Sequence, residues 1–170
     1  MFSLTTSVHV TGLSGLEITD FLSTCDDEAF RRWWPGTHLH FHTVKGTSGK
    51  VGSVIFLDEL VGNRHVKLTC DLTDLVPGRK LVWHLRRPLL RLPVRLIFRL
   101  RDDDTGVQIE QSIQAGFSGF ASLLDPVFRL FFSANFTAAK DEHVRTEFPK
   151  LRDFLRQERM ACPPGSDNVT

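Results

Sequence analysis

The sequence predicts an α+β fold in which a curved antiparallel β-sheet wraps around a long C-terminal α-helix. Two observations support this fold class. Turn-forming residues recur at short intervals between residues 38 and 117 with no helical pattern between them, as expected for an antiparallel meander. A long helical pattern then begins at Asp125-Pro126, an N-cap followed by proline at the first helical position, and runs to Gln157.

The elements are expected in a simple order. A first strand over residues 2–10 precedes two short helices, one over residues 16–22 and one that begins at the acidic run 26–28 and stops at Pro35-Gly36. Six further strands are expected over residues 38–45, 50–61, 64–75, 79–87, 94–101 and 107–117. The proline-flanked residues 88–93 are expected to form a rigid connection.

Alternation along the strands indicates one apolar and one polar face of the sheet, as in Val66, Leu68, Cys70 and Leu72. The C-terminal helix has an apolar line at helical spacing, with small or polar residues in its middle. The residues of this line are Leu130, Ala134, Thr137, Asp141, Val144, Phe148, Leu151 and Leu155. Pro149 is expected to kink or break the helix because it removes one helical hydrogen bond.

Composition restricts the class of protein. The chain has 170 residues, 41% of them hydrophobic and 24% charged, which predicts one soluble domain over residues 1–160 and a frayed tail over 161–170. The net charge of +1 gives no global field for recruiting nucleic acid. Three widely spaced cysteines argue against a disulfide framework, and the N-terminus lacks a signal-peptide pattern. We therefore expect a cytoplasmic protein without a membrane span.

The order of elements and three local motifs resemble the helix-grip fold of the START-like (SRPBCC) superfamily. The motifs are FRRWWPG (30–36), VGSVIFLDEL (51–60) and LVPGRKLVWHL (75–85). The superfamily includes plant pathogenesis-related lipid binders, lipid-transfer domains and bacterial polyketide cyclase-like proteins. The resemblance covers residues 2–157 and implies an apolar cavity between the sheet and the long helix that holds a lipid-like or polycyclic molecule. It carries over no catalytic residue.

The residues themselves also favour such a cavity, because small side chains in mid-helix leave room where a packed core would hold Leu or Phe. The expected ligand-binding residues are Trp34, Leu68, Cys70, Trp83, Phe98, Gln111, Ile113, Phe131, Ala134, Thr137 and Ala138. Gln111 and Thr137 would orient the ligand. The alternative is that the many Phe side chains fill the space and that Gln111 only satisfies a backbone group.

Three histidines, His38, His40 and His42, occupy alternate positions and are expected on one face of their strand. Two of them could bind zinc with a further ligand from a neighbouring strand, such as His65 or His84. A solvated polar row explains the same pattern. We assign no metal and no cofactor from the sequence.

An acidic residue that faces the cavity could act as a general acid or base. Only one of Asp58 and Glu59 can point inward, where a raised pKa would suit a general acid or base. The alternative, a strand-end charge paired with a basic residue, is favoured. The same alternatives apply to Asp141, the sole charge on the helix line.

A basic run surrounds the apolar pair Leu89 and Leu90, and consists of Arg86, Arg87, Arg91, Arg95, Arg99 and Arg101. Such a loop tip could make a weak contact with a membrane surface. A solvated strand face balanced by Glu110 and the acidic turn 102–104 is the favoured alternative.

The sequence thus predicts a protein that binds a hydrophobic small molecule between its sheet and its C-terminal helix. The alternative is an enzyme, a cyclase or dehydratase acting on a polyketide-like substrate in the same pocket, with an ionisable group on the pocket wall. A third reading, an interaction module, would require a filled core and an exposed apolar patch. The sequence identifies neither the ligand nor the oligomeric state.

Overall fold

A computed structural model describes residues 2–87, 90–116 and 133–161. The elements, in chain order, are β1 (Phe2–Thr11), α1 (Gly15–Thr24), α2 (Asp27–Trp33), β2 (His38–Lys45), β3 (Val54–Val61), β4 (Arg64–Val76), β5 (Lys80–Arg87), β6 (Leu90–Asp102), β7 (Gly106–Ala115) and α4 (Ala134–Ala161). In the part of the chain described, no helix is long and apolar enough to cross a bilayer.

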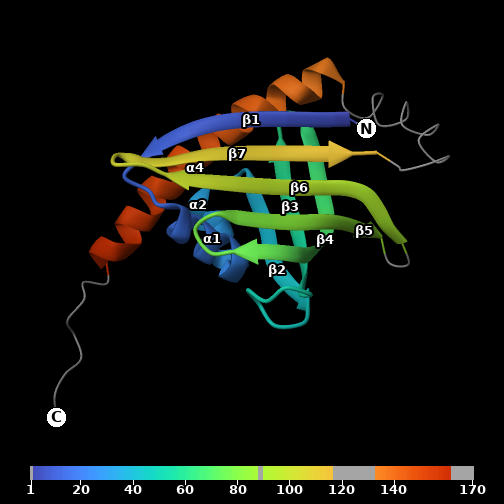
Figure 1. The fold of residues 1–170 in the computed structure, drawn as a ribbon, viewed down its shortest axis with the longest axis horizontal. Helices are drawn as coiled ribbons and strands as arrows, with labels where there is room; N and C mark the ends of the chain where they lie inside the picture. The colour runs from blue at the N-terminus through green and yellow to red at the C-terminus, as the bar shows by residue number, and fades with distance from the viewer. Residues whose placement is uncertain (1, 88–89, 117–132, 162–170) are drawn as a thin grey trace, which may run out of the picture.

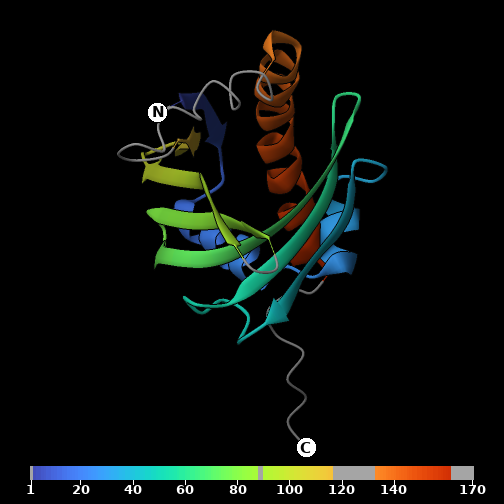
Figure 2. The same cartoon turned by 90° about the vertical axis from the view of Figure 1, so that its right-hand side faces the viewer.

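The strands form one antiparallel sheet of seven strands in the order β1-β7-β6-β5-β4-β3-β2. Every strand after β1 pairs with its neighbour in sequence, and β1 pairs with β7. Figure 2 shows the sheet curving around α4, with β1 and β7 on one side of the helix and β2 and β3 on the other. The predicted helix-grip α+β architecture is therefore confirmed (Figure 1).

Local sequence signals account for the two short helices. The Ser14 side chain accepts the Glu17 amide hydrogen and the Glu17 carboxylate accepts the Ser14 amide hydrogen, which forms a capping box at α1. Asp26 caps α2 by accepting the Ala29 amide hydrogen. Both helices follow β1 and lead the chain to β2 at the far edge of the sheet.

The β3–β4 hairpin turns at Gly62-Asn63. Gly62 has a φ of +58°, in the left-handed region, and a Cβ at this position would lie 2.8 Å from the Cβ of Ala139 in α4. The close approach explains why glycine occupies the turn, and it brings the tip of this hairpin against the long helix.

Two predictions about the C-terminal half are corrected. The helix α4 continues through Pro149 to Ala161, so of the two predicted effects, a kink or a break, this proline does not cause a break. The connection predicted at residues 88–93 is shorter, because β6 begins at Leu90 and pairs with Arg87 of β5. The predicted helix start at Asp125-Pro126 lies outside the described residues.

The core lies between the sheet and the second half of α4. Val144, Phe148 and Leu151 are almost fully buried there and pack with side chains such as Leu72 and Ile109 from the sheet. These three residues belong to the predicted helix line. Toward the start of the helix, however, the buried residues are Phe136, Lys140, His143 and Glu147, whereas Ala134 is exposed and Thr137 is half-buried. The buried face of α4 therefore carries charged residues in its first half.

Candidate functional site

A cavity of about 850 Å³ lies between the sheet and the first half of α4. Most of its wall is apolar and comes from strands β3 to β7 and from α4. The apolar lining includes Leu57, Val61, Val66, Leu68, Trp83, Val94, Leu96, Phe98, Ile113, Phe136 and Val144. Such a volume and lining are typical of a small-molecule binding site.

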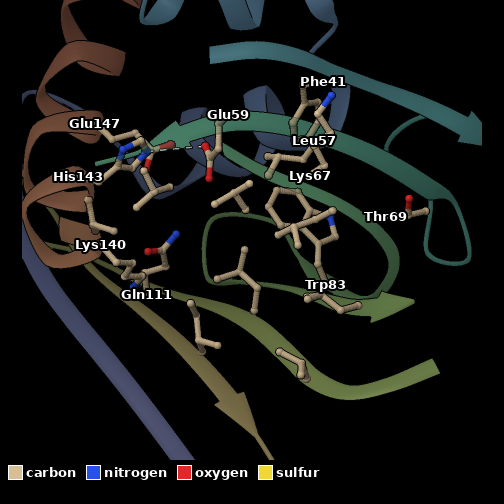
Figure 3. A pocket seen from close by; sticks show the side chains of 18 of the residues that line it. Phe41, Leu57, Glu59, Lys67, Thr69, Trp83, Gln111, Lys140, His143 and Glu147 are labelled. Carbon is tan, nitrogen blue, oxygen red and sulfur yellow. Dashed lines mark ion pairs between the residues drawn. The ribbon is translucent and has the colours of Figure 1, made fainter. Parts of the chain in front are cut away.

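Five of the predicted ligand-binding residues lie on the cavity wall. They are Leu68 on β4, Trp83 on β5, Phe98 on β6, and Gln111 and Ile113 on β7. All five side chains point to the concave face of the sheet, because successive residues of a strand alternate between its two faces. Gln111 is buried and its Oε1 atom has no hydrogen-bond partner, so a polar acceptor faces the cavity (Figure 3).

The other predicted residues lie elsewhere or cannot be placed. Ala134 and Ala138 are exposed and Thr137 is half-buried, and none of these is among the lining residues. They sit on a different face of α4 from the buried Phe136 and Lys140. Cys70 is buried in the core beyond the wall. Phe131 lies outside the described residues.

One end of the cavity carries a polar cluster: Glu59, His143 and Glu147 line the cavity (Figure 3), and the buried His38 completes the group. The Nε2 atom of His38 lies 3.5 Å from Oε1 of Glu147 and 3.9 Å from Oε2 of Glu59. The Nε2 atom of His143 lies 3.6 Å from the same Glu59 oxygen. Three elements, β2, β3 and α4, therefore meet at this cluster.

A β-bulge turns His38 toward the cluster. His38 pairs with Glu59 while His40 pairs with Asp58, so the register shifts between the two histidines. His38 is consequently buried, whereas His40 and His42 face Asp27, at 3.1 and 2.9 Å. The prediction that all three histidines share one face of the strand is wrong for this reason.

Aromatic side chains hold the two histidine rings of the cluster. The His38 ring stacks on Phe30 with a centroid distance of 3.9 Å and an interplanar angle of 3°. The His143 ring stacks on Trp34 at 4.7 Å. Trp33 donates its indole N–H to the main-chain oxygen of Glu147 at 2.9 Å, which ties α2 to α4. Trp34, one of the predicted ligand-binding residues, thus supports the cluster from outside the cavity wall.

Burial and charge shift the pKa values of two groups at this end. Burial lowers the pKa of the Lys140 ammonium to about 8, although Glu147, Asp141 and Glu59 act in the opposite direction. Burial also lowers the pKa of His143, but contacts with Glu59 and Glu147 outweigh it and place that pKa above the usual value. Both groups line the cavity.

Of the three acidic residues considered from the sequence, only Glu59 lines the cavity. Asp58 is buried and pairs with His65 and with Lys67, whose Nζ lies 3.3 Å away. Glu59 is the inward residue of the pair and lines the cavity. Asp141 lies at the edge of α4 and forms an i,i+4 ion pair of 2.8 Å with Arg145.

Acidic partners balance part of the basic run. Arg86 pairs with Asp71 at 2.9 Å and Arg99 pairs with Glu110 at 3.0 Å. Leu89 and the side chains of Leu90 and Arg91 lie outside the described part of the structure.

Sequence reasoning missed Lys140, His143 and Glu147. The signal was present, because residues 136, 140, 143, 147, 151 and 154 follow one another at helical spacing. Charged residues are rarely buried unless they are paired, so a helix line that carries them is not an obvious buried face. The buried face of α4 therefore differs from the predicted apolar line in carrying Lys140, His143 and Glu147.

No protein-family model and no curated protein sequence matches the chain. Solved structures do match its fold. The Thermus thermophilus protein TTHA0849 has a TM-score of 0.59 at 7% identity, covering 92% of this chain and 99% of that one. The Staphylococcus aureus protein of unknown function SA2116 has a TM-score of 0.58 at 10% identity, covering 94% and 97%. Major latex-like protein 151 from Panax ginseng has a TM-score of 0.55 at 12% identity, covering 84% and 96%.

The chain has the helix-grip fold. At these identities the likeness concerns the fold alone. The site of this helix-grip protein must be interpreted from its own residues.

Proposed function

We propose that the protein binds a hydrophobic small molecule, lipid-like or polycyclic, in the cavity between the sheet and α4. The observation that carries this proposal is the cavity of about 850 Å³ with a mostly apolar wall. Glu59, Lys140 and His143 lie together at one end of it (Figure 3), and basic residues such as Lys67, Arg86 and Arg87 also belong to its lining. An amphipathic molecule fits this division, with its polar group at the cluster and its apolar body among the strands.

Burial of apolar surface would supply the driving force. Each Å² of apolar area removed from water contributes about 25 cal/mol before the cost of ordering the ligand is subtracted. Gln111 and Lys140 would orient the polar end, because both present buried polar atoms without a hydrogen-bond partner.

Native mass spectrometry of the purified protein tests the proposal first. A bound molecule that is released on denaturation would identify the chemical class of the ligand. An apolar fluorophore such as 1-aminoanthracene then tests the cavity in protein stripped of ligand. A protein that carries no molecule and binds no apolar fluorophore would contradict the proposal.

A pair of tryptophan variants locates the binding. Leu68→Trp places a larger side chain on the cavity wall, and we expect it to weaken fluorophore binding at least tenfold. Val44→Trp makes a similar change on β2 at a position that is 52% exposed, and it should leave binding unchanged. Equal effects of the two variants would place the fluorophore elsewhere.

A specific observation also favours the second candidate, a cyclase or dehydratase that uses the same pocket. Glu59 and His143 lie on the cavity wall, with 3.6 Å between the Glu59 oxygen and His143 Nε2. A carboxylate and an imidazole at this separation could remove and return a proton next to a ketone of a bound chain.

Proton exchange measures this activity without knowledge of the substrate. The probe is 1-tetralone in D₂O, with deuterium uptake next to the carbonyl followed by NMR. Faster uptake with the wild-type protein, lost in Glu59→Gln but kept in Asp141→Asn, would support the enzyme. Uptake at the uncatalysed rate would favour a carrier.

We also propose a cytoplasmic location and a weak membrane-surface contact at Leu89 and Leu90. Sedimentation with vesicles that contain anionic lipid tests the contact. Wild-type binding that is lost in a Leu89→Ser, Leu90→Ser variant would support it, and no binding would contradict it.

A further inference from the structure

Four side chains at the polar end of the cavity form a compact donor set. One ligand atom from each of His38, Glu59, His143 and Glu147 lies within 4.8 Å of all the others. We propose that these residues bind one divalent transition-metal ion and that Zn²⁺ is the ion they fit best. The inference goes beyond the proposed binding function and does not depend on the identity of the apolar ligand.

The distances match a coordination shell. Zinc bonds of about 2.0–2.1 Å in a tetrahedral arrangement place neighbouring ligand atoms about 3.3–3.4 Å apart. The histidine Nε2 atoms lie 3.5, 3.6 and 3.9 Å from the facing carboxylate oxygens. A contraction of about 0.1–0.6 Å would bring these three pairs to ligand spacing, and the remaining pairs, which lie within 4.8 Å, would close by rotation about side-chain torsions.

The two imidazole nitrogens that face the cluster lack hydrogen-bond partners. Nε2 of His38 and Nε2 of His143 are buried without one, and the side chains of these residues are 0% and 7% exposed. Nδ1 of His38 lies 3.3 Å from the main-chain oxygen of Phe30, a group that can only accept a hydrogen bond. Nδ1 therefore carries the proton, which leaves the lone pair of Nε2 directed at the carboxylates.

This arrangement is the one that metal-binding histidines use. Their second ring nitrogen donates to a carbonyl or carboxylate, which fixes the tautomer and the orientation of the ring. Stacking on Phe30 and Trp34 restrains the His38 and His143 rings further. The site is thus held in position by a surrounding shell of side chains.

A protonated imidazole is the competing explanation. With one extra proton on His38 and with His143 in its Nε2–H tautomer, each nitrogen would face a carboxylate, but at 3.5 and 3.6 Å these contacts are long for hydrogen bonds. Lys140 does not remove the difficulty, because its own Nζ is also buried without a hydrogen-bond partner. A single dication accepts both nitrogens and both carboxylates at once.

The donor types select the ion. Two imidazole nitrogens and two carboxylate oxygens suit Zn²⁺, whereas Ca²⁺ and Mg²⁺ prefer all-oxygen sites. Two carboxylates would also balance the charge of a dication in this buried position.

Metal titration of the full chain without an affinity tag tests the proposal. The protein is dialysed against a chelator and then titrated with Zn²⁺ in a calorimeter, and with Co²⁺ in a visible-absorption experiment. We expect one Zn²⁺ per chain with a micromolar or lower Kd, and a Co²⁺ spectrum of the intensity typical of four-coordinate sites. Absence of saturable Zn²⁺ binding by the wild-type protein would overturn the proposal.

Matched variants assign the site. His143→Gln and Glu147→Gln keep side-chain size and should each weaken Zn²⁺ binding at least about tenfold. The control is a His40→Gln, His42→Gln variant, which removes two histidines outside the cluster and should bind like the wild type. Zn²⁺ binding that is lost only in this control would place the ion on the surface and overturn the assignment.

A Lys140 variant distinguishes between two explanations of the cluster, a bound metal ion and a network of protonated side chains. Lys140→Met removes a positive charge beside the site, and we expect it to tighten Zn²⁺ binding about threefold or more. A Lys140→Met protein that folds but has lost Zn²⁺ binding would contradict the four-residue assignment, because Lys140 is not among the proposed ligands.

Discussion

His38 and Glu59 are register partners at one end of the β2–β3 ladder, and both side chains face the concave side of the sheet. The bulge that follows His38 inserts Leu39 as an extra residue, so the next pair is His40 with Asp58. One inserted residue therefore sends His38 to the cavity end and His40 to Asp27. The composition of the polar cluster depends on this irregularity.

The two leucines near the C-terminal end of α4 should differ in their contribution to stability. Leu151 is 0% exposed, whereas Leu155 is only partly buried. We expect Leu151→Ala to lower the free energy of unfolding by about 2–5 kcal/mol and Leu155→Ala by about 1 kcal/mol or less. Urea unfolding followed by circular dichroism measures both. Similar losses would mean that the buried face of α4 is rotated from the one described.

Two neighbouring alanines test the other end of the same helix. Ala138 is exposed, whereas the Cβ of Ala139 lies close to Gly62. We expect Ala138→Lys to change stability by about 0.5 kcal/mol or less and to leave fluorophore binding unchanged. Ala139→Lys should destabilise the protein by about 1–3 kcal/mol because the hairpin must move. Weaker fluorophore binding in Ala138→Lys would contradict this and would show that Ala138 belongs to the binding site, as the sequence predicted.

The contribution of Asp27 to the free energy of unfolding should depend on pH. Burial raises the pKa of this carboxyl, but hydrogen bonds from His42, His40 and the Phe41 amide outweigh it and lower the pKa from 3.8 to about 2. The charged form is thus favoured in the folded state. Its contribution is present above about pH 4 and is lost as the pH falls toward 2.

The measurement compares the wild type with Asp27→Asn. The difference between their unfolding free energies should be largest above pH 4 and should shrink below it. Asp20→Asn, an exposed position on α1, is the control and should show a small difference at every pH. A difference for Asp27→Asn that does not change with pH would contradict the pKa assignment.

The buried thiols should resist modification. Burial raises the pKa of Cys70 from 9.0 to about 12, which lowers its thiolate fraction at pH 8 about 1000-fold. Burial raises the pKa of Cys25 as well. In a Cys162→Ser background, we expect iodoacetamide at pH 8 to label neither residue until urea is added. Peptide mass spectrometry identifies the labelled site, and rapid labelling of Cys70 in the folded protein would show that it is reachable from the cavity.

Local sequence patterns were sufficient for the run of antiparallel strands and for five residues of the cavity wall. Alternation decides which side chains of a regular strand share a face, and turn residues decide where each strand ends. Leu68, Trp83 and Phe98 were therefore placed on the concave face from the sequence, and the structure has them there. The order of β2 to β7 followed as well, because consecutive strands joined by short turns pair with each other, whereas the pairing of β1 with β7 was not predicted.

The polar end of the cavity follows from contacts that no local sequence pattern predicts. A bulge such as that at Leu39 arises from pairing with a neighbouring strand, and no local pattern marks it. The burial of Lys140, His143 and Glu147 opposes their individual preference for water, and Glu59 and His38 from distant strands help to offset it. The helix-grip scaffold could be predicted from the sequence because the periodicity of strands and helices is a local property. The charged site on that scaffold depends on contacts between residues far apart in the chain.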